Sequence, residues 1–200
     1  MIPLALLVAL AEPDAQPALV PLGPPLRTEV RYATADNFTG APLPGYCKPI
    51  ALLHPTVAAA LAGVAATLAK RQLGLLVYDA YRPVRATRAM VAWARRTHRE
   101  WVIEKGYVAE RSGHNLGTTV DLTLVELKSG TPLDMGTPWD HFGAAAHTRN
   151  ARGAVLERRL LLERAMLDAG FRPLRNEWWH FSYPLAGIEP RDEPIGCESP

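Results

Sequence analysis

The segment 119–124, Thr-Val-Asp-Leu-Thr-Leu, has the β-branched and apolar composition of a buried strand, yet it contains a carboxylate at Asp121. Strands are depleted in aspartate, and a buried carboxylate is costly unless it is paired or bound to a cation. Any fold that buries this strand must therefore supply a partner for Asp121. A turn or an arginine could serve. So could a metal ion shared with His114, which lies seven residues earlier in the loop-like stretch Ser-Gly-His-Asn-Leu-Gly.

The other segments of the chain predict a single α+β domain. Its 200 residues are 48% hydrophobic and 21% charged, a balance that fits one globular unit. Helical patterns and short apolar runs alternate irregularly, with no internal repeat and no glycine-rich phosphate loop. This order favours a small, mostly antiparallel sheet flanked by helices. The expected helices are 55–72, 83–101 and 154–168, and the expected strands are 75–79, 119–124 and 178–183.

The N-terminus predicts a targeting segment. Residues 2–10 are apolar, and Ala-Leu-Ala at 9–11 has the small-x-small pattern of a signal-peptidase site. The segment is too short to span a bilayer and lacks a preceding Lys or Arg, so a plain hydrophobic chain end is the alternative. With 1–11 as a signal peptide, the protein would be periplasmic or otherwise exported, without stable membrane insertion after signal removal; otherwise it would be cytoplasmic. The proline-rich stretch 12–26 predicts an extended linker, which leaves 27–200 as the main folded domain.

The two cysteines, Cys47 and Cys197, are far apart and have no metal-binding spacing. In an exported protein, such a pair suggests a disulfide that ties the C-terminal tail to the early part of the domain. Two independent free thiols are the alternative.

The charge of the chain argues against nucleic-acid binding. A formal net charge of +2 is too small to indicate a polyanionic partner. The arginine pairs at 95–96 and 158–159 lie in helical patterns, where solvated helix faces are expected.

His114 and His180 stand out among the six histidines because each is associated with a carboxylate in or next to an expected strand. Asp121 follows His114, and Glu177 precedes His180 in Asn-Glu-Trp-Trp-His-Phe. Two imidazoles and one carboxylate can occupy three positions of a tetrahedral zinc ion and leave the fourth for water, from which Glu177 could take a proton. On spacing alone, structural roles are an equal alternative. A regular strand would also point Glu177 and His180 to opposite faces, so a bulge, twist or loop entry must lie between them.

Arg82 lies where an expected strand ends and a proline-initiated helix begins, in Tyr-Asp-Ala-Tyr-Arg-Pro. From that position its guanidinium could project into a cleft and stabilise an oxyanion. A salt bridge with Asp79 or a surface position is the alternative, and the residues by themselves slightly favour it.

Together these motifs resemble those of the VanX-type D-alanyl-D-alanine dipeptidases, which are zinc peptidases. The resemblance extends from about Tyr32 to Glu193, and it is specific because the motifs occur together and in the family's order. Ala80 departs from the glycine often found at its position, and the export-like N-terminus lies outside the pattern. The matching motifs are 32–34 (Tyr-Ala-Thr), 36–40 (Asp-Asn-Phe-Thr-Gly), 79–83 (Asp-Ala-Tyr-Arg-Pro), 105–109 (Lys-Gly-Tyr-Val-Ala), 112–114 (Ser-Gly-His), 121–124 (Asp-Leu-Thr-Leu), 135–136 (Met-Gly), 177–180 (Glu-Trp-Trp-His) and 191–194 (Arg-Asp-Glu-Pro).

The resemblance implies one zinc ion per chain, held by His114, Asp121 and His180 in a cleft at the sheet. It also implies that Glu177 is the general base and that Arg82 stabilises the tetrahedral intermediate. The positions that it matches to substrate-binding residues are Ser112, Asp140 and Tyr32.

The expected activity is hydrolysis of the dipeptide D-Ala-D-Ala in cell-wall metabolism, and the D stereochemistry rests on the resemblance alone. A free dipeptide carries an ammonium and a carboxylate close together, so its enzyme should present an anion for one end and donors for the other. Asp140 can be the anion, unless it caps a helix at 141–147. The alternatives are a zinc D,D-carboxypeptidase or endopeptidase acting on peptidoglycan stem peptides, and a non-catalytic binding module. The motifs do not specify an oligomeric state.

Overall fold

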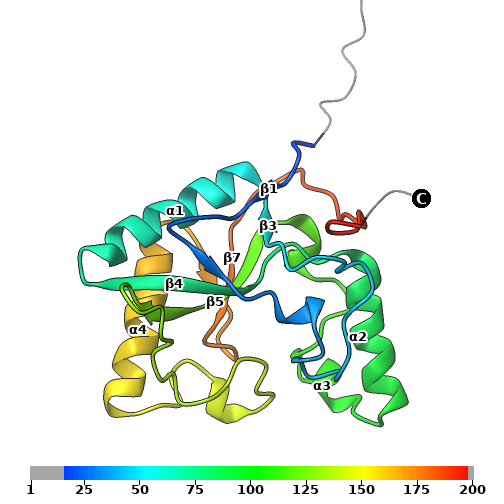
Figure 1. Cartoon of the computed structure of the whole chain (residues 1–200). Coiled ribbons are helices and arrows are strands. Elements are labelled where there is room, and N and C mark those ends of the chain that lie inside the picture. Colours follow the sequence, from blue (N-terminus) through cyan, green and yellow to red (C-terminus); the bar gives the residue numbers. More distant parts are fainter. Residues whose placement is uncertain (1–15, 198–200) are drawn as a thin grey trace, which may run out of the picture.

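The computed structural model describes residues 16–197 of the chain (Figure 1). Its α-helices are α1 (Pro55–Ala69), α2 (Val84–Arg96), α3 (Trp101–Glu104) and α4 (Gly153–Asp168). Its strands are β1 (Val20–Pro21), β2 (Arg27–Thr28), β3 (Leu52–Leu53), β4 (Leu73–Asp79), β5 (Thr119–Glu126), β6 (Arg172–Pro173) and β7 (His180–Ser182). Three short 3-10 turns are η1 (Arg31–Ala33), η2 (Gly113–Leu116) and η3 (Ala144–Ala146). None of the helices between residues 16 and 197 has the length and hydrophobicity that crossing a membrane requires.

The main sheet confirms the predicted α+β class. It has five strands in the order β2-β4-β5-β7-β6, and every neighbouring pair is antiparallel except β2 and β4. The strands β1 and β3 form a separate antiparallel pair. Helices α1 and α4 contact each other and pack on β4 and β5, whereas α2 and α3 lie on the other side of the molecule (Figure 1).

The central strands carry polar residues to one place in the sheet. Strand β4 is buried along nearly its whole length because its core is Leu-Leu-Val-Tyr, and β5 is buried up to Val125. In the antiparallel register, Asp79 at the end of β4 pairs with Asp121 of β5, and Asp121 pairs with His180 of β7. Three polar side chains far apart in sequence are therefore set side by side across the sheet.

Three of the predicted elements are shorter in the structure than in the prediction, and the first, the helix expected over 55–72, ends at Ala69 before a turn in which Gln72 has φ 57°. The helix expected to reach about residue 101 ends at Arg96, because His98 adopts a left-handed backbone with φ 54° before α3 begins. The strand expected over 178–183 is limited to His180–Ser182, since Trp178 and Trp179 form a turn before it. Each difference is a backbone reversal that the apolar pattern did not reveal.

The segment predicted as a linker differs from that prediction where it is described. Between residues 16 and 26 it contains strand β1, which pairs with β3, and a turn closed by the Leu26 amide, which donates to the Gly23 carbonyl at 3.1 Å. The Leu22 amide also donates to the Ala51 carbonyl at 2.8 Å. Leu26 is buried and Leu19 packs against the core. The leucines between the prolines thus attach this stretch to the domain. The signal peptide predicted at 1–11 lies outside the described residues.

The C-terminal tail is bonded to the early part of the domain by a disulfide between Cys47 and Cys197. The two Cα atoms are 5.0 Å apart, and 150 positions separate them in sequence. The two cysteines are therefore bonded to each other and are not free thiols.

Candidate metal centre and surrounding cleft

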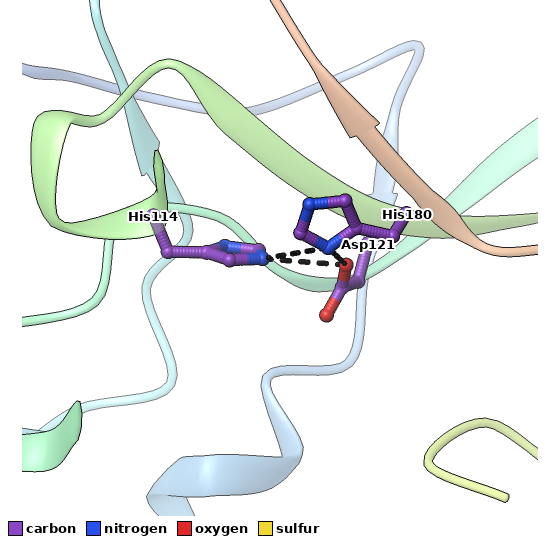
Figure 2. A group of neighbouring side chains, drawn as sticks. All are labelled: His114, Asp121 and His180. Atoms are coloured by element: carbon purple, nitrogen blue, oxygen red, sulfur yellow. Dashed lines mark hydrogen bonds and ion pairs between the residues drawn. The ribbon is translucent and has the colours of Figure 1, made fainter. Parts of the chain in front are cut away.

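His114, Asp121 and His180 meet in one cluster, although each comes from a different element: η2, β5 and β7 (Figure 2). The Asp121 Oδ1 atom lies 3.3 Å from His114 Nε2 and 3.0 Å from His180 Nδ1. The two imidazole nitrogens are 3.4 Å apart. The cluster is well enclosed, because His114 and Asp121 are buried and His180 is largely so.

The hydrogen bonds of His114 determine which of its ring nitrogens faces the cluster. Its Nδ1 atom is 2.6 Å from the carbonyl oxygen of Ala80, an acceptor that requires a proton on Nδ1. In the neutral ring, Nε2 then presents a lone pair toward Asp121. Asp121 Oδ1 is buried and has no hydrogen-bond partner among the described residues, as expected for an atom that binds a cation.

The spacing of the three atoms fits zinc. Tetrahedral ligands about 2.0–2.1 Å from a zinc ion are separated from one another by about 3.3 Å. The observed separations of 3.0, 3.3 and 3.4 Å bracket that value. Although burial works against the charge of Asp121, the two histidines hold the pKa of this carboxyl well below its ordinary value, so it is the anionic member of the set.

The turn that presents His114 is built by local hydrogen bonds. The Ser112 hydroxyl accepts from the His114 amide at 3.2 Å, and the Asn115 side chain accepts from the Ser112 amide at 3.3 Å, which together form a capping box. Gly117 ends the turn in the left-handed region at φ 67°. A Cβ atom at Gly113 would collide with Thr119 Oγ1 at the start of β5. Both glycines are therefore needed to bring His114 back over the strand.

Arg82 satisfies both alternatives that the sequence left open. Its guanidinium is ion-paired with Asp79, with Nε and Nη2 at 3.0 and 2.8 Å from Asp79 Oδ2. It also reaches the cleft, where Nη2 lies 4.0 Å from Asp121 Oδ2 and the group stacks 5.0 Å from the centre of the Tyr32 ring. Burial works against its charge, but Asp79 and the neighbouring tyrosines raise the pKa of Arg82 above its ordinary value, so the cation is retained.

Asp79 has a larger part in the site than the sequence analysis gave it. Its side chain is fully buried, and its second oxygen, Oδ1, accepts a hydrogen bond of 2.6 Å from the Tyr46 hydroxyl. The Oδ2 atom that holds Arg82 is also 3.4 Å from His114 Nδ1. The available signal was the same as for Asp121, a carboxylate within an otherwise apolar strand.

Glu177 lies against the metal cluster, with Oε2 at 3.6 Å from His180 Nδ1. The turn formed by Trp178 and Trp179 separates Glu177 from β7, and this loop entry allows both side chains to face the cleft. Burial, followed by the charges of Asp121 and Asp140, raises the pKa of Glu177 well above its ordinary value, even though Arg82 opposes the shift.

Asp140 faces the same cleft, in a left-handed backbone with φ 59°. Its Oδ2 atom accepts a hydrogen bond of 2.8 Å from the Tyr32 hydroxyl. The predicted alternative of a helix cap is not observed, because the short turn η3 follows instead of a helix and its N-cap residue is Gly143. Burial and the charge of Asp121 raise the pKa of Asp140 well above its ordinary value.

One cavity of about 220 Å³ collects the predicted site residues. Trp139 was missed by sequence analysis, yet its indole Nε1 donates to Asp121 Oδ2 at 3.3 Å and so holds the ligand carboxylate from the side opposite the histidines. Aromatic and loop residues such as Phe38, Tyr107 and Phe142 complete the wall. The eight predicted residues that line this cavity are Tyr32, Arg82, Ser112, His114, Asp121, Asp140, Glu177 and His180.

Comparisons with known proteins show which family the sequence resembles. A family model described as D-Ala-D-Ala dipeptidase matches residues 18–195. The D-alanyl-D-alanine dipeptidase of Enterococcus faecalis is 36% identical over 172 residues, which cover 78% of this chain and 85% of that protein. The enzyme of the same name from Escherichia coli is 37% identical over 169 residues, covering 84% and 83%.

A solved structure of the vancomycin-resistance D,D-pentapeptidase VanY in complex with Zn(II) is also similar to this chain. It is 16% identical, has a TM-score of 0.42, and the match covers 66% of this chain and 73% of that one.

Proposed function

The chain belongs to the D-Ala-D-Ala dipeptidase family, and from this premise we propose that it hydrolyses D-Ala-D-Ala with one zinc ion held by His114, Asp121 and His180. The observation that carries the proposal is that the three potential ligand atoms, spaced as zinc requires, share one small cavity with Glu177 and Arg82. An acid–base group and a fixed cation beside an open metal position are the parts that peptide hydrolysis needs.

Zinc bound at this position supplies Lewis-acid chemistry, which activates water and polarises a peptide carbonyl. Glu177 is the proposed general base. Because burial raises its proton affinity, it can accept a proton from the attacking water and then deliver it to the leaving amine.

Arg82 is the proposed donor to the oxyanion that develops on the scissile carbonyl. Its Nε and Nη2 atoms donate to Asp79, whereas the partner of its Nη1 atom within residues 16–197 is the Met90 sulfur, a weak acceptor, at 3.4 Å. A guanidinium held rigidly on one side can donate on the other without reorganising.

The substrate's two charged ends are the proposed partners of Asp140 and Ser112. An ammonium group near Asp140 would offset the burial that raises the pKa of this carboxyl, and Tyr32 fixes its orientation through the 2.8 Å hydrogen bond. Ser112 also lines the cavity. A cavity of about 220 Å³ favours a small dipeptide over a long peptide.

We further propose that the protein is exported. The apolar residues 2–10 followed by Ala-Leu-Ala support a signal peptide, and the Cys47–Cys197 disulfide is typical of an oxidising compartment. Fractionation of cells that express the full-length chain should recover it outside the cytoplasm without residues 1–11; recovery of the uncleaved chain in the cytoplasm would contradict export.

The decisive experiment is an assay of the purified zinc-loaded protein on three substrates: D-Ala-D-Ala, L-Ala-L-Ala and a stem pentapeptide that ends in D-Ala-D-Ala. We expect turnover of D-Ala-D-Ala alone. Cleavage of only the pentapeptide would identify a D,D-carboxypeptidase instead, and binding without turnover of any of the three would indicate a non-catalytic module.

Two variants separate metal binding from proton transfer. His114→Ala should lose zinc, as measured by metal analysis after purification. Glu177→Gln should retain zinc but lose turnover by about 10²-fold to 10⁴-fold. Turnover close to that of the wild type in zinc-loaded Glu177→Gln would show that another group is the general base.

A further inference from the structure

The last described residues of the chain lie close to the backbone segment that carries Arg82. We call residues 191–197 the C-terminal strap. At its start, the Arg191 carbonyl accepts from the Val84 amide at 3.0 Å, and the Arg191 amide donates to the Asn115 carbonyl at 2.9 Å. The Asn115 side chain in turn donates to the carbonyl of Arg82 at 2.7 Å. The strap is therefore connected to the backbone on which the arginine is mounted.

Farther along, the strap is fastened to residues 45–48. The Ile195 amide donates to the Gly45 carbonyl at 2.7 Å, and the Ile195 carbonyl accepts from the Cys47 amide at 3.1 Å. These bonds form a parallel bridge between Tyr46 and Ile195. Immediately beyond them, the disulfide joins Cys47 to Cys197. Backbone hydrogen bonds to Gly45 and Cys47, together with the disulfide at Cys47, therefore hold the residues on both sides of Tyr46.

Tyr46 connects this fastening to the catalytic arginine. It is buried, and its hydroxyl donates to Asp79 Oδ1 at 2.6 Å, while Asp79 Oδ2 holds Nε and Nη2 of Arg82. Among the described residues, the lining of the cavity includes Arg82 but neither Tyr46 nor Asp79. An effect of Tyr46 on the reaction must therefore pass through the orientation of the Asp79 carboxylate.

The orientation of the Asp79 carboxylate depends on the hydrogen bond that it accepts from the Tyr46 hydroxyl. A buried carboxylate oxygen that loses its hydrogen-bond donor is strongly unfavourable, and the carboxylate would rotate to recover one. Such a rotation would move the oxygen to which the Arg82 fork is bonded. Between η1 and β3 the chain has no regular secondary structure, so the links to the strap hold Tyr46 in place together with the packing of its ring 6.0 Å from that of Tyr32.

We propose that Tyr46 is a positioning residue for Arg82, acting through Asp79, and that the disulfide-fastened C-terminal strap holds it in place. The inference rests on the proposed function, since Arg82 is taken to donate to the oxyanion. Its consequence is that the Cys47–Cys197 bond serves turnover as well as stability. Reduction of this bond should lower the rate of the folded enzyme.

The first test compares Tyr46→Phe with the control Tyr183→Phe, which removes the hydroxyl of a tyrosine whose ring contacts Phe171 edge-to-face. In Tyr46→Phe, kcat for D-Ala-D-Ala should fall by about 10-fold to 100-fold with KM changed less than about twofold, because the lost orientation affects the oxyanion donor. Tyr183→Phe should leave kcat unchanged.

A second readout does not depend on activity. By ¹⁵N NMR of the full chain, hydrogen exchange of the buried Arg82 Nε–H should accelerate at least about tenfold in Tyr46→Phe, because its acceptor is no longer held. The exchange rate in Tyr183→Phe should match that of the wild type. An unchanged Arg82 exchange rate in Tyr46→Phe would overturn the proposal, whatever the protein hydrolyses.

The disulfide is tested with the double variant Cys47→Ser/Cys197→Ser, because thiol reductants would also bind zinc. With equal zinc content and well below the melting temperature, this variant should show a lower kcat, by at least about threefold, and faster Arg82 Nε–H exchange than the wild type. A lower Tm with unchanged kcat and unchanged exchange would show a purely stabilising disulfide and overturn this part.

The measurements distinguish a wrong proposed function from a wrong positioning role of Tyr46. If the wild type does not cleave D-Ala-D-Ala but Tyr46→Phe loosens Arg82, the proposed function is wrong and the positioning role stands. If the wild type cleaves the dipeptide and both variants match it in kcat and in exchange, the positioning role is wrong and the proposed function stands.

Discussion

Two arginines are buried among the described residues, and their side chains donate hydrogen bonds to different kinds of acceptor. Arg82 is 8% exposed and bonds to the carboxylate of Asp79 at the edge of the cleft. Arg159, in α4, is 1% exposed, and its side-chain hydrogen bonds to the described part of the chain go to main-chain carbonyls: Nε to Met135 at 2.8 Å, and Nη1 to Ala145 and His147 at 3.0 and 2.9 Å.

The difference shows how a buried cation can serve chemistry or architecture. Arg82 has a carboxylate on one side and a cavity on the other, so its charge is available to a substrate. Arg159 has its donors directed at the ends of the loop 135–147, which contains Asp140, and its role is to hold that loop on α4. Burial lowers the pKa of Arg159, whereas the carboxylates raise that of Arg82.

The largest expected effect is on catalysis, from Arg82→Lys. Lysine keeps the positive charge but cannot both grip Asp79 with two donors and reach the substrate. Turnover of D-Ala-D-Ala should fall about 10³-fold, equivalent to about 4 kcal/mol in the barrier. Steady-state kinetics and metal analysis on the same preparation check this. A near-normal kcat with retained zinc would mean that charge alone suffices at this position.

Arg159→Met should affect stability instead. Methionine fills much of the same volume but leaves three carbonyls without their donor, so the free energy of unfolding should drop by roughly 2–4 kcal/mol. Urea denaturation measures the loss. If kcat measured in the absence of urea fell as far as in Arg82→Lys, the two arginines would not be divided between chemistry and architecture in this way.

A smaller effect is expected from Gly136→Ala, in the loop that Arg159 holds. The backbone at Gly136 has φ 81°, and a Cβ there would lie 2.7 Å from Val155 Cγ1 of α4. The free energy of unfolding should fall by about 1–3 kcal/mol. Gly153→Ala is the matched control, because Gly153 also has a positive φ but has open space around it. Equal losses in both variants would assign the cost to the backbone and not to the contact with α4.

The smallest effect should come from an exposed arginine. Arg95 pairs with Glu110 at 2.7 Å, but both side chains are about 60% exposed. Water screens such a pair, so Arg95→Ala should change the free energy of unfolding by less than about 0.5 kcal/mol. A loss as large as that of Arg159→Met, seen by the same urea denaturation, would contradict the view that burial gives an arginine its importance here.

Sequence patterns predicted the residues that line the site better than the residues that hold them in position. The residues expected to bind zinc and substrate all line one cavity, because their types and motif order identify the chemistry they can perform. Arg159, however, was expected on a solvated helix face together with Arg158. Its charge gave no sign of burial, since its acceptors are carbonyl groups, which every residue possesses. The same holds for Tyr46, whose partner Asp79 is 33 positions away.

The sequence by itself determined the local features of this protein. The helix α1 begins at Pro55, Gly117 ends the turn that carries His114, and Asp121 interrupts an apolar strand, because steric limits and hydrogen bonding act over a few residues. Only the tertiary structure decided that Asp79, Asp121 and His180 lie in one row and that Glu177 turns toward them. Strand register and loop closure depend on packing across the whole core, which no short stretch of sequence encodes.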